Sequence, residues 1–337
     1  MPLCVGLRDQ ALNEQINHAL DGNSILITGA SGLVGLNMMS LLASASSRGE
    51  SSIEIYGVSR SGSLPDGFPE PGNVTMIARD LAEPKSYEDL PEADFVVHGA
   101  TYGQPAKFTP RPTETILLNT LGTAELMKRA RKSFLFLSTS ELYSGLEEGP
   151  YLESQIGTTN TDHPRAGYIE AKRAGEAMTL AHRGATQLGK VARLSLAYGP
   201  GARFDDERVM YELISRALRE KRVTLRGGAE SVRSYIYIDD ALRYLLSILL
   251  GGQTDIYNVG GTEAVTLESL AQKIADLLGL EFENQEKRES LELRSAPRDV
   301  RLDMSKSREL AGHFTHTSLS DGLVNTIAWM RQVVDTR

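Results

Sequence analysis

Short hydrophobic segments alternate with longer amphipathic segments through the first 200 residues of the chain. Each short segment has the length and composition of a strand that is buried on both faces, and the longer segments have the period of helices. Such alternation predicts an α/β fold with a doubly wound parallel sheet. The expected strands are residues 24–28, 53–59, 74–81, 94–100, 133–144 and 191–200.

After residue 200 the pattern is less regular and richer in charge. A strand expected at 256–261 (IYNVGG) returns to the first sheet, so two lobes are interleaved along the chain. Expected helices are 5–20, 207–220, 266–279 and 319–334, and Trp329 in the last of them is expected to be a core residue. The predicted boundaries are 1–200 plus about 235–262 for a larger first domain, and about 201–234 plus 263–337 for a smaller second lobe.

A glycine-rich turn joins the first strand to the following helix. SILIT is followed by GASGLVG, which places Gly29, Gly32 and Gly35 with the spacing GxxGxxG. Missing side chains at these positions permit a tight turn, close approach of the backbone to a pyrophosphate, and close helix packing. A purely structural turn is the alternative. We expect a Rossmann-type dinucleotide site at this turn. Further cofactor contacts are expected from Ser31, Leu33 and Val34.

The next three strands are expected to end beside the adenosine half of the cofactor. The second strand ends where an Asp or Glu usually holds the ribose hydroxyls of NAD, but this chain has Ser-Arg-Ser at 59–61. Arg60 either contacts a 2′-phosphate and favours NADP, or is a solvated loop residue. Asp80 either lies near the adenine or caps a loop. Leu81 and Ala100 complete the expected contacts, and the choice between NAD and NADP stays open.

Composition and charge limit the classes of partner that the protein can bind. The chain has 337 residues, of which 41% are hydrophobic, and a net charge of −8, which gives no general attraction to nucleic acid or to an anionic membrane. The single cysteine, Cys4, excludes an internal disulfide, and no Cys/His cluster predicts a metal site. No apolar run reaches the ~20 residues of a membrane span, and the N-terminal segment is too polar for a secretory signal. We therefore expect a cytoplasmic protein with a small-molecule partner.

Tyr168 and Lys172 lie four residues apart in the segment PRAGYIEAKRAGEAM. On a helix they would share one face, where the ammonium lowers the energy of a tyrosinate that can take a proton. The alternative is a tyrosine packed inward beside a solvated lysine. The segment 133–144 ends in hydroxyls and a carboxylate at the edge where parallel sheets present their chemistry, and this favours the catalytic interpretation.

At this point the chain resembles the extended short-chain dehydrogenase/reductase superfamily, in its NAD-dependent epimerase/dehydratase group that acts on nucleotide sugars. TGASGLVG, STSELY, YIEAK, LAYGPG and IYNVGG occur in the family's order across nearly all the chain. Ala100 to Thr123, the run PRAGYIEAKRAGE and the DERV after YGPGARF look like UDP-glucuronate decarboxylases (UDP-xylose synthases). STSELY is also similar to the corresponding strand of GDP-mannose 4,6-dehydratases.

The resemblance implies a role for each residue at this edge. Thr139 would hydrogen-bond the sugar O4, Tyr168 would take the O4 proton, and Lys172 would hold the nicotinamide ribose and acidify the tyrosine. The C4 hydride would then pass to the cofactor. Ser140 and Glu141 would steer the 4-keto sugar, with Glu141 either abstracting the C5 proton or orienting water and sugar while a carboxylate departs. A loop or helix N-terminal carboxylate is the alternative for Glu141.

Other site residues follow from the same resemblance. Asn119 matches an asparagine that the family places near the active site, and Arg233 matches an arginine against the nucleotide phosphates or the sugar. Arg301 is a weaker candidate for that task and Arg298 weaker still. The chain departs from the family at Leu196, where relatives commonly have an asparagine that touches the sugar nucleotide, and in the missing acid after the second strand.

These observations predict a lyase that oxidises a nucleotide-linked sugar at C4 with bound NAD or NADP and then eliminates carbon dioxide or water. A 4-epimerase or keto-sugar reductase is the alternative among enzymes, and a non-catalytic NAD(P)-sensing protein is the alternative of another class. The family resemblance also implies a homodimer, paired through the helices that follow residues 108 and 168. No metal is expected.

Overall fold

The computed structural model describes residues 3, 7, 10–64, 73–181, 188–203, 206–285 and 299–335. Cys4 and Arg298 lie outside this set, so the expectations for them have no structural counterpart. Within the segment expected to be helical at 5–20, helix α1 runs from Gln10 to Leu20.

Seven parallel strands form the main sheet, in the order β10-β6-β5-β4-β1-β2-β3. The strands are β1 (Ser24–Thr28), β2 (Glu54–Ser59), β3 (Val74–Ala78), β4 (Ala93–His98), β5 (Ala130–Thr139), β6 (Leu188–Leu194) and β10 (Ile256–Val259). The order reverses direction between β1 and β4, which are adjacent in the sheet. In doubly wound sheets, ligands bind in the crevice outside the carboxyl ends of the strands at such a reversal. The α/β fold class is confirmed.

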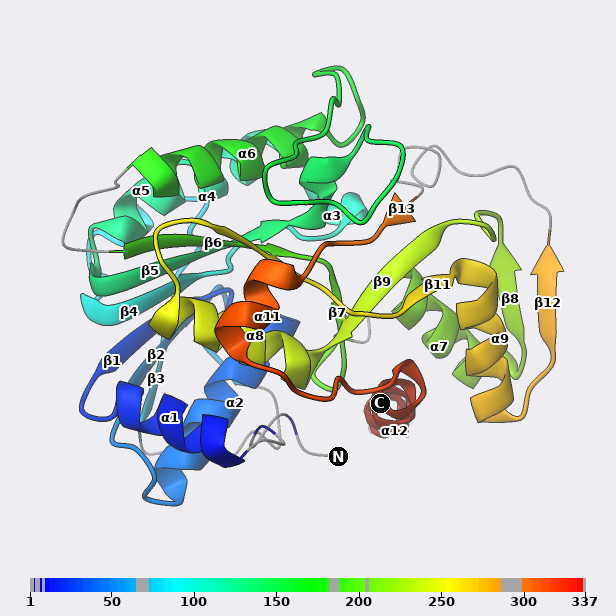
Figure 1. Cartoon of the computed structure of the whole chain (residues 1–337), viewed down its shortest axis with the longest axis horizontal. Coiled ribbons are helices and arrows are strands. Elements are labelled where there is room, and N and C mark those ends of the chain that lie inside the picture. The colour runs from blue at the N-terminus through cyan, green and yellow to red at the C-terminus, as the bar shows by residue number, and fades with distance from the viewer. Residues whose placement is uncertain are drawn as a thin grey trace.

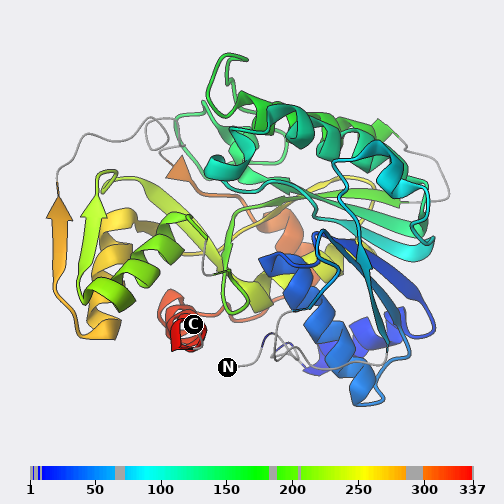
Figure 2. The same cartoon turned by 180° about the vertical axis from the view of Figure 1, so that it is seen from behind.

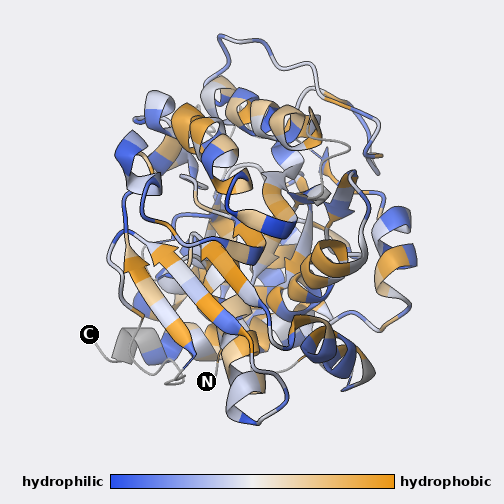
Figure 3. Ribbon diagram, turned by 90° about the vertical axis from the view of Figure 1, so that its left-hand side faces the viewer, coloured by the Kyte–Doolittle hydropathy of each residue, from blue (hydrophilic) through white to orange (hydrophobic). Residues whose placement is uncertain are grey.

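Helices cover both faces of this sheet, and for that reason its strands read as continuous hydrophobic runs (Figure 1). Figure 3 shows hydrophobic residues along the strands of this sheet, and every residue of β1 is buried. One face is covered by α4 (Pro112–Asn119), α5 (Leu121–Met127) and α6 (Ala166–Ala181). The other face is covered by α1, α2 (Leu33–Ser47) and α8 (Ile238–Gly251).

A smaller group of elements packs beside the carboxyl edge of the main sheet (Figures 1 and 2). Its strands form a mixed four-stranded sheet and a parallel pair. The mixed sheet contains β7 (Leu196–Tyr198), β9 (Val232–Tyr237), β11 (Ala264–Thr266) and β13 (Asp299–Val300). The pair is β8 (Val223–Arg226) with β12 (Phe282–Gln285). The helices of this group are α7 (Val209–Glu220), α9 (Leu267–Leu278) and α12 (Leu319–Asp335). The short elements that accompany the main sheet are α3 (Pro105–Phe108), α11 (Ser305–Ala311) and the 3-10 turns η1 (Pro84–Tyr87) and η2 (Ser140–Tyr143).

Several expected strands extend past the strands observed, and hydrogen bonds explain the two largest differences. β5 ends at Thr139 rather than at 144, because the Thr139 hydroxyl accepts the Glu141 N–H and starts the 3-10 turn η2. The strand expected at 191–200 is interrupted at Ser195, whose N–H donates to Val259 O and whose hydroxyl donates to Ser234 O. The chain leaves the main sheet at this point and continues as β7 beside β9.

The segment at 256–261 behaves as the sequence predicts, since β10 pairs with β6 in the main sheet. The proposed division into two lobes stays a prediction. Trp329 is half-buried against the core, where its indole N–H donates to Ala202 O, and it does not line the large cavity described below. Among the described residues, no helix combines the length and apolar character needed to cross a membrane.

Candidate active site

A cavity of about 810 Å³ lies where the carboxyl ends of the main-sheet strands face the smaller group of elements. The turn between β1 and α2 and the ends of β2 to β5 supply one wall, and α7, β8 and β9 supply residues of the other. A cavity of this size suits a small organic ligand. It therefore forms at the place that the strand order indicates.

The glycine turn gives the backbone room to approach a ligand. Gly29 has a φ of +73°, and a Cβ there would lie 2.8 Å from the carbonyl carbon of Gly99. A Cβ on Gly35 would lie 2.6 Å from Gly29 O, so the helix could not pack on the turn with any larger residue. Gly32 caps α2 without a side chain, so no side chain stands between the helix N-terminus and the cavity. These features fit a pyrophosphate. Ser31, Leu33 and Val34 also line the cavity.

The ends of β2, β3 and β4 bring Arg60, Asp80, Leu81 and Ala100 to the same cavity. Asp80 lines the cavity, and its carboxylate caps its own loop by accepting the Ala82 N–H at 3.1 Å. The N–H of Ala100 donates to the Thr28 hydroxyl at 3.2 Å. The structure thus gathers these sequence-predicted residues along one part of the cavity wall.

Thr139, Tyr168 and Lys172 line the cavity from the end of β5 and from α6. The Tyr168 hydroxyl is hydrogen-bonded to Thr139, and its ring stacks on Phe108 at a centroid distance of 4.6 Å. The Lys172 ammonium donates to Leu137 O at 2.6 Å and lies 4.7 Å from the Phe136 ring centroid. All three side chains are buried, and each of the two helical residues is fixed by contacts with its neighbours.

Burial is the largest cause of the pKa shifts of Tyr168 and Lys172. It raises the pKa of Tyr168 to about 12, although the hydrogen bond with Thr139 and the charges of Arg165 and Arg208 oppose the shift. Burial also lowers the pKa of Lys172 to about 7, against the charge of Glu176. The acidified tyrosine that the sequence leads us to expect therefore requires a further positive charge at this place, such as an oxidised nicotinamide.

Glu141 and Ser140 follow Thr139 on η2 and line the cavity beside it. One carboxylate oxygen of Glu141 accepts a hydrogen bond from Arg165, with which it forms an ion pair. Its other oxygen, Oε2, is buried and has no hydrogen-bond partner among the described residues. Sequence reasoning missed Arg165, although it lies three residues before Tyr168 in the quoted segment PRAGYIEAK.

Asn119 and Arg301 do not line the cavity. The Asn119 amide is fully buried and donates to the Thr101 hydroxyl at 3.0 Å and to Thr115 O at 2.8 Å. Because Thr101 lines the cavity, Asn119 supports the wall from behind. Arg301 forms an ion pair with Asp299. The structure therefore brings neither residue into the place expected for direct cofactor or phosphate contact.

The wall opposite the glycine turn is rich in arginine. Arg233 on β9 lines the cavity, as does Leu196, the residue at which the chain departs from the family pattern. Sequence reasoning missed the other arginines on this side, which are Arg203, Arg208, Arg216 and Arg226. Among the described lining residues, ten are Lys or Arg and five are Asp or Glu, whereas the whole chain has a net charge of −8. The cavity is thus suited to an anionic ligand.

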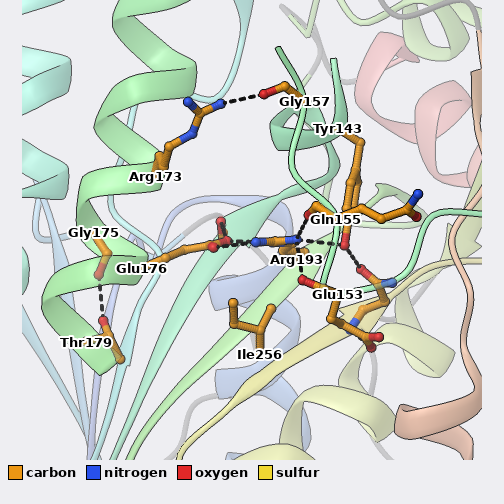
Figure 4. A network of polar contacts seen from close by, with 12 residues as sticks. Tyr143, Glu153, Gln155, Gly157, Arg173, Gly175, Glu176, Thr179, Arg193 and Ile256 are labelled. Carbon is orange, nitrogen blue, oxygen red and sulfur yellow. Dashed lines mark hydrogen bonds and ion pairs between the residues drawn. The ribbon is translucent and has the colours of Figure 1, made fainter. Parts of the chain in front are cut away.

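A buried polar network supports α6 from behind the cavity (Figure 4). The guanidinium of Arg193 on β6 donates to both carboxylate oxygens of Glu176, at 2.9 and 2.8 Å, and Ser138 donates to the same carboxylate at 2.5 Å. Arg193 also donates to the Tyr143 hydroxyl on η2, which donates to Asn258 on β10. The network therefore ties together the helix, the η2 turn and the sheet that carry the catalytic candidates.

The comparisons with known proteins agree with this geometry. The model of the NAD dependent epimerase/dehydratase family matches residues 25–260. UDP-glucuronic acid decarboxylase 2 of Arabidopsis thaliana is 30% identical over 319 residues, which cover 93% of this chain and 69% of that protein. The chain therefore belongs to the NAD-dependent epimerase/dehydratase family and is an enzyme of that family.

Two solved structures show the same architecture. The epimerase Mth375 of Methanothermobacter thermautotrophicus superposes with a TM-score of 0.80 at 20% identity, covering 96% of this chain and 97% of that one. MoeE5 in complex with UDP-glucuronic acid and NAD superposes with a TM-score of 0.75 at 25% identity, covering 92% of this chain and 99% of that one. No group of His, Cys, Asp and Glu suited to a metal ion occurs among the described residues.

Proposed function

We propose that the protein is a nucleotide-sugar lyase, which oxidises the sugar at C4 with bound NAD(P) and then eliminates carbon dioxide or water. The observation that carries the proposal is the placement of Thr139, Tyr168 and Lys172 beside a second acid–base candidate, Glu141, on one cavity wall. The similarity to UDP-glucuronic acid decarboxylases supports decarboxylation of UDP-glucuronate as the branch to test first.

Oxidation comes first because a ketone at C4 activates the neighbouring carbon. Thr139 would hold the sugar O4, and Tyr168 as a tyrosinate would take the O4 proton. When bound, the cofactor supplies an oxidised nicotinamide that accepts the hydride from C4. Lys172, which is buried beside this group, would hold the nicotinamide ribose and stabilise the tyrosinate. The C4–O4 bond thereby becomes a carbonyl.

The ketone makes either elimination possible. With a C5 carboxylate, the sugar is a β-keto acid, and the C5–carboxylate bond breaks to release carbon dioxide while its electron pair delocalises onto O4. With a C6 hydroxyl instead, Glu141 would take the C5 proton through its unpaired Oε2 and pass it to the departing C6 hydroxyl, which leaves as water while a C5–C6 double bond forms. Ser140 would orient the keto sugar in both cases, and the arginines opposite would hold its phosphates.

The glycine turn, Ser31, Leu33, Val34, Leu81 and Ala100 would hold the dinucleotide. Arg233 is proposed to contact the pyrophosphate or the sugar, since it is buried in the wall opposite. The outer face of α4 and α6 is proposed to pair with a second copy of the chain. Those helices pack against one another, and Ile116 on α4 is 41% exposed.

The decisive experiment supplies four substrates to the purified enzyme: UDP-glucuronate, GDP-mannose, dTDP-glucose and CDP-glucose. Carbon dioxide or a dehydrated keto sugar is expected from one of them, together with exchange of the C4 hydride. Tyr168→Phe should lower turnover at least ~100-fold, since it removes the acid–base group. Tyr56→Phe, which changes a tyrosine outside the cavity, is the control.

Glu141→Gln separates a lyase from an epimerase. A 4-epimerase needs only a rotation of the keto sugar and should keep its rate. A lyase should lose on the order of 100-fold, because Glu141 would either take the C5 proton or orient water and sugar while the carboxylate departs. Glu170→Gln, on α6 but outside the cavity lining, is the matched control. Absence of carbon dioxide, keto sugar and hydride exchange with all four substrates would count against the proposal.

A further inference from the structure

The tip of β2 lacks the carboxylate that an NAD site would use. Residues 59–64 read SRSGSL and contain no Asp or Glu. The Ser59 hydroxyl is buried and accepts the Gly62 N–H at 3.1 Å, so it is engaged within its own turn. In dinucleotide sites an acidic side chain at the end of this strand binds the ribose hydroxyls of NAD, and a nearby arginine accommodates the 2′-phosphate of NADP.

The turn after β2, which carries Arg60, packs closely against the end of β3. Gly62 has a φ of +64°, and a Cβ on it would lie 2.6 Å from the Ala78 Cβ at the end of β3. Only glycine lets the turn lie this close to the neighbouring strand. Arg60 is therefore presented at the tip of a packed turn, where it lines the cavity with its guanidinium carbon 5.9 Å from the Tyr102 ring centroid.

A second arginine reaches the cavity from the adjacent strand end. Arg79 directly follows β3, lines the cavity, and donates its backbone N–H to Ser59 O at 3.0 Å. Its ion pair with Asp89 is long, at 3.7 Å, and the Asp89 side chain is 82% exposed, so the pair is weak. Two guanidinium groups thus lie at neighbouring strand ends, and their forked donors match a phosphate.

We propose that the protein binds NADP in preference to NAD, with Arg60 and Arg79 at the 2′-phosphate of the adenosine. This inference rests on the proposed function, because it assigns the cofactor of the same site, and it departs from the NAD named in the family's description. Asp80 contributes one negative charge nearby but also caps its own loop by accepting the Ala82 N–H. The two positive guanidinium groups still match the charge of a doubly negative phosphate in the presence of Asp80.

The test measures binding of the adenosine half alone, without any turnover. Cofactor-free protein is titrated calorimetrically with adenosine 2′,5′-bisphosphate and with adenosine 5′-monophosphate. The bisphosphate should bind at least ~10-fold more tightly, and the preference should shrink as salt rises, since it comes from charge. Arg60→Gln should bring the affinity for the bisphosphate close to that for the monophosphate and leave the latter unchanged. Arg222→Gln, an exposed arginine that does not line the cavity, is the matched control.

Three results would overturn the proposal. These are equal affinities in the unaltered protein, an Arg60→Gln variant that keeps the preference, and a variant that weakens both ligands to the same extent. Mass spectrometry of the nucleotide that co-purifies provides a second readout, which should find NADP. A protein that carries NAD and still exchanges the C4 hydride would refute this inference and leave the proposed function standing. Tight bisphosphate binding without any conversion of a nucleotide sugar would support this inference and refute the proposed function.

Discussion

Two glutamate–arginine pairs involve α6 or the residue that precedes it, and they differ in how fully their polar atoms are hydrogen-bonded. Glu176 and Arg193 have side chains that are only 5% and 2% exposed, and both carboxylate oxygens of Glu176 accept hydrogen bonds. Glu141 and Arg165 are 22% and 10% exposed, and Oε2 of Glu141 has no partner among the described residues. The first pair lies behind the helix and the second faces the cavity.

The difference shows how one chemical motif can serve two purposes. A buried charge is tolerated when every polar atom has a partner, so the Glu176–Arg193 pair acts as part of the scaffold. A buried oxygen left without a partner costs free energy in the folded chain, and such costs are characteristic of functional sites. We therefore interpret Glu141 as a group whose second oxygen is completed by substrate or water.

The largest expected effect comes from breaking the scaffold pair. Arg193→Met should lower the free energy of unfolding by about 3–5 kcal/mol. Of the donors to the buried Glu176 carboxylate that the described residues supply, it leaves only the Ser138 hydroxyl. Urea denaturation would measure the loss. Lys128→Met, which breaks the surface pair of Lys128 with Glu125, is the control and should cost less than about 1 kcal/mol.

The double variant Glu176→Leu/Arg193→Met tests the reason for that loss. If the unpaired charge causes most of it, removing both charges should recover a large part of the stability. A single Arg193→Met variant that is no less stable than Lys128→Met would show that the pair is not a scaffold element.

An intermediate effect is expected at His98, a buried polar residue that is satisfied on both ring nitrogens. Nδ1 lies 2.9 Å from the Thr28 hydroxyl and Nε2 lies 3.0 Å from Leu118 O, which suits the neutral ring. Burial lowers the pKa of His98 to about 3, and the charge of Lys172 adds to the shift. Unfolded chains bind a proton near pH 6.5, so acidification favours unfolding.

Stability should therefore fall as the pH drops below 6.5, with His98 contributing on the order of 2 kcal/mol between pH 7 and pH 5. His98→Gln should remove that part of the pH dependence, which urea denaturation at the two pH values would detect. His18→Gln changes an exposed histidine and is the control. An unchanged pH dependence in His98→Gln would mean that the buried ring is not held neutral.

The smallest expected effect on stability is that of Glu141→Gln. The amide keeps the shape of the side chain and removes a partly unsatisfied carboxylate, so the free energy of unfolding should change by no more than about 1 kcal/mol. Thermal or urea denaturation at pH 7 would measure it. A loss as large as that of Arg193→Met would place Glu141 in the scaffold and erase the difference between the two pairs.

Much of this site follows from local sequence. The β1–α2 turn can be predicted because only glycine tolerates the close contacts at Gly29 and Gly35. Tyr168 and Lys172 can be predicted as neighbours because helix spacing places them on one face. Arg165 was not predicted as a site residue, although it lies in the same segment as Tyr168. Nothing in its local sequence indicates that its guanidinium bonds to Glu141, 24 residues earlier. Asn119, which was expected near the active site, bonds to Thr101 behind the cavity wall. Arg301, the weaker candidate for phosphate contact, bonds to Asp299.

The sequence by itself determined the class of the fold, the glycine turn between β1 and α2, and the candidates Tyr168 and Lys172 on one helical face, because periodicity and short spacings act over one or two turns of chain. The tertiary structure decided which charges are buried in pairs and which arginines of α7, β8 and β9 face the sheet. It also decided that the chain leaves the main sheet at Ser195 and continues in the smaller one. These outcomes depend on contacts between residues far apart in the chain, whose burial and desolvation no local pattern specifies.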